Sequence, residues 1–141
     1  MADSKTIMVP SVDIQPSQLY ISCEKVKAVQ DLVDFSDVKA IPPIPIKELN
    51  GLLIMTDGHT RAYAAYLAGL STVPVVWDDD ALDWEAYQIC VEWCQKEGIQ
   101  TIADLHSRVL NAQDYQEKWL NRCRKMQADL AKKRNETHSI S

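Results

Sequence analysis

The chain has 141 residues, of which 46% are hydrophobic and 25% are charged, and its formal net charge is −5. This length is typical of one domain with one core, and the composition is too apolar for a disordered protein. The negative charge argues against a protein that mainly holds duplex DNA, and no apolar run is long enough to span a bilayer. We therefore expect a cytoplasmic protein that does not contact a membrane.

The first third of the chain predicts two short extended segments and one helix. Residues 7–9 and 12–16 are expected to be extended, because prolines in and beside them exclude a helix interior. A helix should begin at Ser22, whose hydroxyl can cap the first free N–H groups, and end near Phe35.

A β-hairpin followed by a helix is predicted next. Asn50-Gly51 lies between the apolar segments 41–49 and 52–55, and this pair is a strong hairpin signal. The apolar period then becomes helical over residues 59–68, and residues 71–77 have the composition of another strand. These elements predict a small mixed sheet with packed helices, so the expected fold class is α/β (α+β).

The remaining chain is helical in pattern. Helices are predicted from about Asp83 to Glu97, from Thr101 and from Ala112. Apolar residues recur every three to four positions on the last helix, so one face should pack on the body or on a second copy. These residues are Tyr115, Trp119, Cys123, Met126 and Leu130.

The expected organisation is a core over residues 1–80, a helical extension over 81–134 packed on that core, and a disordered tail over 135–141. The four cysteines include no CxxC pair, and three of them lie on apolar stripes of predicted helices. Buried free thiols are therefore expected rather than metal ligands.

The motif Asp57-Gly58-His59-Thr60-Arg61 carries the predicted chemistry. A strand that turns directly into a helix leaves backbone N–H groups unpaired at the positive end of the helix dipole, where an anion binds. Gly58 lets a phosphate approach the backbone, and the next three residues offer donors. Asp57 would repel a bare phosphate, so we expect it to coordinate Mg²⁺ or to accept the proton of a substrate hydroxyl. The alternative is a simple turn followed by a surface arginine.

The order of elements over residues 7–77 resembles the ParB/sulfiredoxin-like superfamily of small α/β domains. The resemblance rests on Pro16, the proline-rich segment 41–46, the motif of residues 57–61 and Val73-Pro74-Val75. It implies that the turn binds a nucleotide, ATP, ADP or CTP, together with Mg²⁺. Members of the family include partition proteins that bind and hydrolyse CTP, sulfiredoxins that use ATP, and free-serine kinases that use ADP or ATP.

The turn is most similar to the Asp-Gly-His-x-Arg turn of the free-serine kinases. The reactive cysteine of sulfiredoxin is replaced here by His59, and the chain after Trp77 is too short for the further domains of partition proteins. The catalytic glutamate of the kinases would fall near Gln18, which is not an acid. Glu24 is the nearby substitute, with the alternative that it only complements the dipole of its helix.

Motif and resemblance together predict a nucleotide- or phosphate-binding domain. The hypothesis for its activity is a small-molecule kinase or NTPase, acting on a hydroxyl-bearing metabolite such as free serine. The candidate site residues are Asp57 and Glu24 for catalysis, Gly58, His59, Thr60 and Arg61 for phosphate, and Asp57 for the metal.

The alternative function is a non-catalytic ParB-like module that binds DNA or protein through its basic last helix. Residues 112–134 carry seven Lys and Arg against three Asp and Glu. Such cations are commonly surface residues that complement the helix dipole, and the overall charge disfavours DNA. The same helix is also the expected contact of a homodimer.

Overall fold

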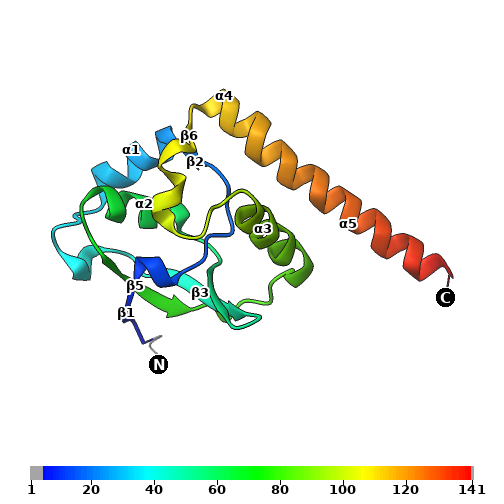
Figure 1. Ribbon diagram of the computed structural model, residues 1–141, viewed down its shortest axis with the longest axis horizontal. Coiled ribbons are helices and arrows are strands. Elements are labelled where there is room, and N and C mark those ends of the chain that lie inside the picture. The colour runs from blue at the N-terminus through cyan, green and yellow to red at the C-terminus, as the bar shows by residue number, and fades with distance from the viewer. Residues whose placement is uncertain (1–4, 141) are drawn as a thin grey trace.

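A computed structural model describes residues 5–140 as a mixed α/β fold, with the backbone alone described for residues 137–140 (Figure 1). The strands are β1 (Ile7–Pro10), β2 (Ile21–Ser22), β3 (Ile44–Leu49), β4 (Leu52–Met55), β5 (Thr72–Trp77) and β6 (Val109–Leu110). The α-helices are α1 (Cys23–Leu32), α2 (His59–Leu67), α3 (Trp84–Lys96), α4 (Ala112–Tyr115) and α5 (Asn121–Ile140). Three 3₁₀ turns, η1 (Ser11–Asp13), η2 (Val38–Ala40) and η3 (Ile102–Ser107), and one π-helical turn, η4 (Gln116–Leu120), complete the fold.

The main sheet has the strand order β1-β5-β3-β4. The pair β3 and β5 is parallel and the two outer pairs are antiparallel, which confirms the expected mixed sheet. Asn50 and Gly51 both have positive φ, 51° and 82°, as the tight turn of the β3–β4 hairpin requires. The short strands β2 and β6 pair in parallel apart from this sheet. In the described part of the chain, no helix is both long and apolar enough to cross a membrane.

Helix starts follow the capping residues that the sequence offers. The Ser22 hydroxyl accepts the N–H of Lys25 at the start of α1, and the Asp83 carboxylate accepts the N–H of Ala86 at the start of α3. Helix α2 begins after Gly58 and is followed by Gly69, which has a φ of 87°. The positions of these helices therefore agree with the sequence prediction.

Two segments differ from what the sequence predicted. Ser11–Asp13 is a 3₁₀ turn rather than an extended segment, because both the N–H and the hydroxyl of Ser11 bond to the carbonyl of Ser71, at 2.9 and 3.2 Å. Helix α5 continues to Ile140 through the predicted disordered tail, of which only Ser141 lies outside the described residues. Adding residues to an existing helix needs no new nucleus, so a polar end can continue it.

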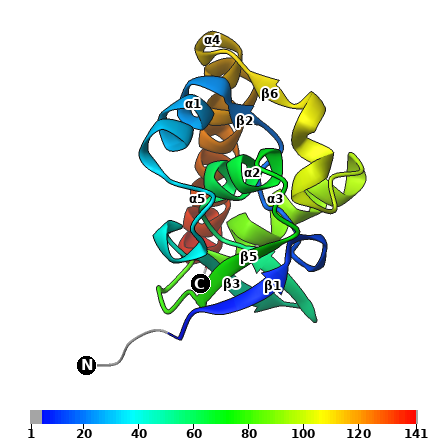
Figure 2. The same cartoon turned by 90° about the vertical axis from the view of Figure 1, so that its left-hand side faces the viewer.

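The C-terminal helix is continuous from α4 through η4 to α5. Its apolar stripe is buried in the same hydrophobic cluster as the sheet, at Tyr115, Trp119, Met126 and Leu130. Figure 1 shows α5 running past α3 and away from the sheet, and Figure 2 shows α1 and α2 on one side of the sheet. The stripe thus packs on the body of the same chain.

Candidate functional site

The predicted anion turn is formed by a left-handed glycine at the start of α2. Gly58 has φ 76° and ψ 18°, and its N–H donates to Oδ1 of Asp57 at 2.8 Å. The next three N–H groups, of His59, Thr60 and Arg61, have no acceptor in the described part of the chain, because they precede the first intrahelical bond. The turn therefore presents three backbone donors at the positive end of a helix.

The side chain of Arg61 lies against this glycine. A Cβ atom at position 58 would be 2.8 Å from Nη2 of Arg61, which is closer than real contacts allow. The left-handed backbone favours glycine here, and any larger residue would displace the half-buried guanidinium. The sequence thus places a forked cationic donor directly at the turn with the free N–H groups.

His59 has a different environment from the one that a phosphate ligand would need. It is 4% exposed, and its Nε2 accepts the backbone N–H of Ser17 at 2.9 Å. Burial lowers the pKa of His59 to about 4, although the nearby Asp57 carboxylate opposes this shift. The ring is therefore neutral at pH 7, and the proton is on Nδ1, which has no partner in the described part of the chain.

A cavity of about 220 Å³ lies beside the turn. Its lining comes from the core, from α3 and from the C-terminal helix: Ser17, Gln18, Thr56, Asp57, His59, Asp83, Ala86, Tyr87, Cys90, Trp119, Cys123, Met126 and Gln127. Asp57 and His59 belong both to the turn and to this lining. Gly58, Thr60 and Arg61 lie at the turn, outside the lining.

The cavity is acidic and has several neutral polar groups. Asp57 and Asp83 contribute carboxylates, and none of the lining residues is Lys or Arg. The Tyr87 hydroxyl donates to the Thr56 carbonyl at 2.9 Å, and burial, followed by the Asp57 carboxylate, raises the pKa of Tyr87. The Thr56 hydroxyl donates to Oδ2 of Asp78 at 2.6 Å. A small neutral or cationic polar molecule suits this lining better than an anion does.

Of the two candidate positions near the start of α1, Gln18 and Glu24, only one lines the cavity. Glu24 is exposed in the first turn of α1 and does not line the cavity. Gln18 does line it, and its amide donates to the carbonyl of Tyr20 at 2.7 Å and to Oη of Tyr115 at 3.0 Å. Gln18, the position at which the resemblance implies a catalytic glutamate, is therefore at the cavity. Glu24, the nearby acid that could replace it, is not.

The sequence analysis missed most of the residues that close the cavity. Tyr87 lies one helical turn after Asp83, the residue that caps α3. This cap was a local signal that Tyr87 lies at the start of the helix that follows β5. Trp119 and Gln127 belong to the C-terminal helix, and no local pattern shows which part of the core that helix contacts. Within the described part of the chain, no group of three or more His, Cys, Asp or Glu side chains could hold a metal ion.

Comparison with known proteins gives little information for this chain. No family model matches it, and no curated protein matches it. Among solved structures, it is similar to protein Atu1540 from Agrobacterium tumefaciens, with 11% sequence identity and a TM-score of 0.45. That match covers 73% of this chain, and it spans 62% of the length of Atu1540. A likeness this weak carries no argument about function.

Proposed function

We propose that this chain is a ParB/sulfiredoxin-like domain whose Gly58 turn binds the phosphates of a nucleotide. The observation that carries the proposal is the pairing of the left-handed Gly58 with the Arg61 guanidinium, beside three free N–H groups. Backbone donors at a helix start together with a forked cation are the groups that proteins use to hold phosphate. The reaction that we propose is phosphoryl transfer to a small hydroxyl-bearing molecule such as free serine.

The size and charge of the cavity support separate places for the two substrates. Its volume of about 220 Å³ is below the roughly 300 to 1,000 Å³ of sites for drug-sized ligands, so it suits a small acceptor rather than a nucleoside. Asp83 is paired with Arg134, but the Asp57 carboxylate, which has no ion pair in the described part of the chain, repels phosphate. The nucleotide therefore lies along the open side of the turn, and the acceptor enters the cavity with its hydroxyl at Asp57, which borders both.

Asp57 has two chemical roles that fit this position. Mg²⁺ is commonly held by one or two carboxylates together with substrate phosphates and water, so a single carboxylate at the turn suffices. When bound, Mg²⁺ would neutralise charge that develops on the transferred phosphoryl group. Asp57 would otherwise accept the proton of the acceptor hydroxyl, and Nδ1–H of His59 can donate to the acceptor without adding charge.

The first experiment is a thermal-shift screen of ATP, ADP and CTP, each with and without Mg²⁺. A nucleotide that binds only the folded chain raises its stability, by about 2.7 kcal/mol at a hundredfold excess over Kd. Any nucleotide that shifts the midpoint is then incubated with the protein and free serine, and phosphoserine is measured. If no nucleotide shifts the midpoint at millimolar concentration, the proposal is wrong.

Asp57→Asn separates the two roles, and Glu24→Gln is the matched control at an acid outside the cavity. If Asp57 holds the metal, Asp57→Asn loses the Mg²⁺ dependence of nucleotide binding. If Asp57 is the base, the variant binds nucleotide with Mg²⁺ as the parent does and forms no product. Glu24→Gln is expected to behave as the parent in both assays, since its carboxylate is exposed and is not part of the lining.

The alternative of a DNA-binding module would use the basic C-terminal helix. Two of its arginines contact acids of the same chain, Arg122 with Glu97 at 3.4 Å and Arg134 with Asp83 at 2.8 Å. These contacts leave less positive charge for phosphate, so we favour the small-molecule function. Duplex binding with a steep salt dependence would support the module instead. The cytoplasmic location and the homodimer stay predictions.

A further inference from the structure

Two cysteines from different helices meet on the wall of the cavity. Cys90 in α3 is buried and Cys123 in α5 is half-buried, and both line the cavity beside Asp57. The two thiols are close enough for each to shift the pKa of the other. A hydrogen bond with Cys123 is the largest cause that raises the pKa of Cys90, and the same contact lowers the pKa of Cys123. Cys90 therefore holds its proton more tightly, and Cys123 has the greater thiolate character.

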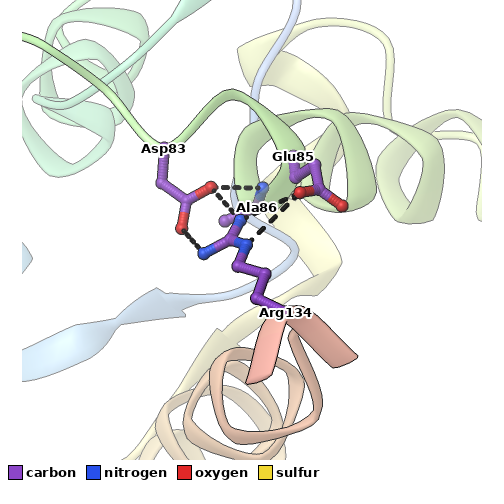
Figure 3. Close-up of polar contacts among 4 residues, drawn as sticks. All are labelled: Asp83, Glu85, Ala86 and Arg134. Carbon is purple, nitrogen blue, oxygen red and sulfur yellow. Dashed lines mark hydrogen bonds and ion pairs between the residues drawn. The ribbon is translucent and has the colours of Figure 1, made fainter. Parts of the chain in front are cut away.

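Two other contacts between α3 and α5 show the register that brings these thiols together. The rings of Trp93 and Trp119 meet edge to face with centroids 6.1 Å apart, one helical turn from the thiol pair on each helix. At the other end, Nη2 of Arg134 lies 2.8 Å from Oδ1 of Asp83 (Figure 3). The helices are thus antiparallel, and the thiol pair lies between two independent contacts that hold them side by side.

The other two cysteines lack this combination of partner and exposure. Cys94 lies one turn further along α3, where burial raises its pKa to about 12. Cys23, in α1, does not line the cavity. Arg122 adds to the thiolate character of its neighbour, because a positive charge nearby favours the anion. Cys123 is therefore both the more exposed thiol of the pair and the one whose pKa is lowered.

We propose that Cys90 and Cys123 form a peroxide-reactive dithiol, which is oxidised to an intramolecular disulfide that joins α3 to α5 at the cavity wall. The Cys123 thiolate attacks one oxygen of hydrogen peroxide, the O–O bond breaks, and the leaving hydroxide takes a proton to become water. Cys123 is then a sulfenic acid. The Cys90 sulfur loses its proton and attacks the Cys123 sulfur, and a second water leaves. Two thiols and one peroxide thus give one disulfide and two waters.

This reaction is independent of the proposed nucleotide site, although the two thiols line the cavity that we propose for the acceptor. The sulfur atoms must approach one another to form the bond, which draws α5 toward α3 beside Tyr87 and Gln127. The disulfide reverts to two thiols on reduction. In the oxidised chain a disulfide joins α3 to α5 at the cavity wall. In the reduced chain only non-covalent side-chain contacts join the two helices there.

The test uses the full reduced chain, treated with increasing hydrogen peroxide under native conditions and then alkylated. Before alkylation the intact mass is expected to fall by two hydrogen atoms, and after alkylation a non-reducing digest is expected to link the Cys90 peptide to the Cys123 peptide. Dithiothreitol should restore both masses. The proposal is overturned if both peptides stay unlinked at a peroxide concentration that oxidises dithiothreitol, or if the linked peptides contain Cys94 or Cys23 instead.

Serine variants identify the attacking thiol. Cys123→Ser is expected to form no disulfide, whereas Cys94→Ser and Cys23→Ser are expected to form it at the parent's yield. Iodoacetamide added to the native reduced parent should label Cys123 before Cys90 and Cys94. Labelling of Cys94 first would overturn the assignment, and this measurement on the parent decides the matter even if a variant fails to fold.

Discussion

The backbone N–H of Ser17 donates to Nε2 of His59 over 2.9 Å, and the two residues are 6% and 4% exposed. This bond joins the loop before β2 to the first residue of α2, across 42 positions of sequence. It requires an unprotonated Nε2, so protonation of His59 would break a buried bond and bury a charge.

The first prediction is a pH dependence of stability that comes from His59. Its pKa is about 4 in the folded chain and 6.5 when unperturbed, so below pH 6.5 the unfolded chain binds a proton that the folded chain excludes. The stabilising effect is complete above pH 6.5 and is lost as the pH falls toward 4. The free energy of unfolding should decrease by about 1.4 kcal/mol per pH unit in that window, or about 3 kcal/mol in all.

Urea unfolding of the parent, His59→Gln and His106→Gln between pH 4 and 7 checks this dependence. His59→Gln should lose the slope whatever its absolute stability, and His106→Gln, a change at an exposed residue, should keep it. The carboxyls of Asp34, Asp83 and Asp104, whose pKa values are lowered from 3.8, act at the acid end of this window and below it, and all three proteins contain them. Equal slopes in all three proteins would contradict the prediction.

The second prediction compares Gly58→Ala with Gly51→Ala. Both glycines have positive φ, 76° and 82°, so each substitution should cost about 1 to 2 kcal/mol of stability from backbone strain. No atom lies within 4 Å of an added Cβ at Gly51, whereas at Gly58 the Cβ would displace the Arg61 guanidinium. Phosphate or nucleotide affinity, measured by calorimetry, should fall in Gly58→Ala alone. Equal affinities in the two variants would remove Arg61 from the site.

The third prediction is that Arg61→Ala loses nucleotide binding and keeps its fold. Loss of a forked, charge-assisted contact to phosphate should cost about 2 to 4 kcal/mol, or roughly 30- to 1,000-fold in affinity. Arg124→Ala is the matched control, since it removes the same charge from an exposed position on α5. Calorimetry gives the affinities and circular dichroism gives the fold. Parent-like binding by Arg61→Ala would refute the site, and its unfolding would make Arg61 structural.

The fourth prediction separates the two contacts of Asp83, which caps α3 and pairs with Arg134 (Figure 3). Asp83→Ala loses the cap on the Ala86 N–H and should cost about 1 kcal/mol. Asp83→Asn keeps a capping oxygen, and Arg134→Ala leaves the cap intact, so both should change stability little, because the ion pair is 43% and 44% exposed.

Urea unfolding at low and high salt measures these differences. The small effect of Arg134→Ala should shrink further in high salt, since exposed pairs are screened. The cost of Asp83→Ala should persist, because a hydrogen bond to a backbone N–H is local. A cost for Arg134→Ala as large as that for Asp83→Ala would show that the ion pair, rather than the cap, holds α3.

Features that depend on a few neighbouring residues were predictable. The Asn50-Gly51 hairpin and the helix starts at Ser22 and Asp83 follow from backbone conformations and caps that particular residue types favour. The three free donors of the anion turn have the same origin, because every helix start leaves them. Local patterns also showed which face of the C-terminal helix is apolar, although not what that face covers.

Contacts between distant segments were decided by tertiary packing alone. The turn motif suggested His59 as a phosphate donor, but the approach of Ser17 buries the ring and makes it a neutral acceptor. Glu24 is close to Gln18 in sequence, yet only Gln18 lines the cavity. The meeting of Cys90 with Cys123 depends on the antiparallel register of two helices. Hydrophobic burial is non-directional, so an apolar stripe specifies that a face is covered, while the complementary shapes of the assembled elements determine its partner.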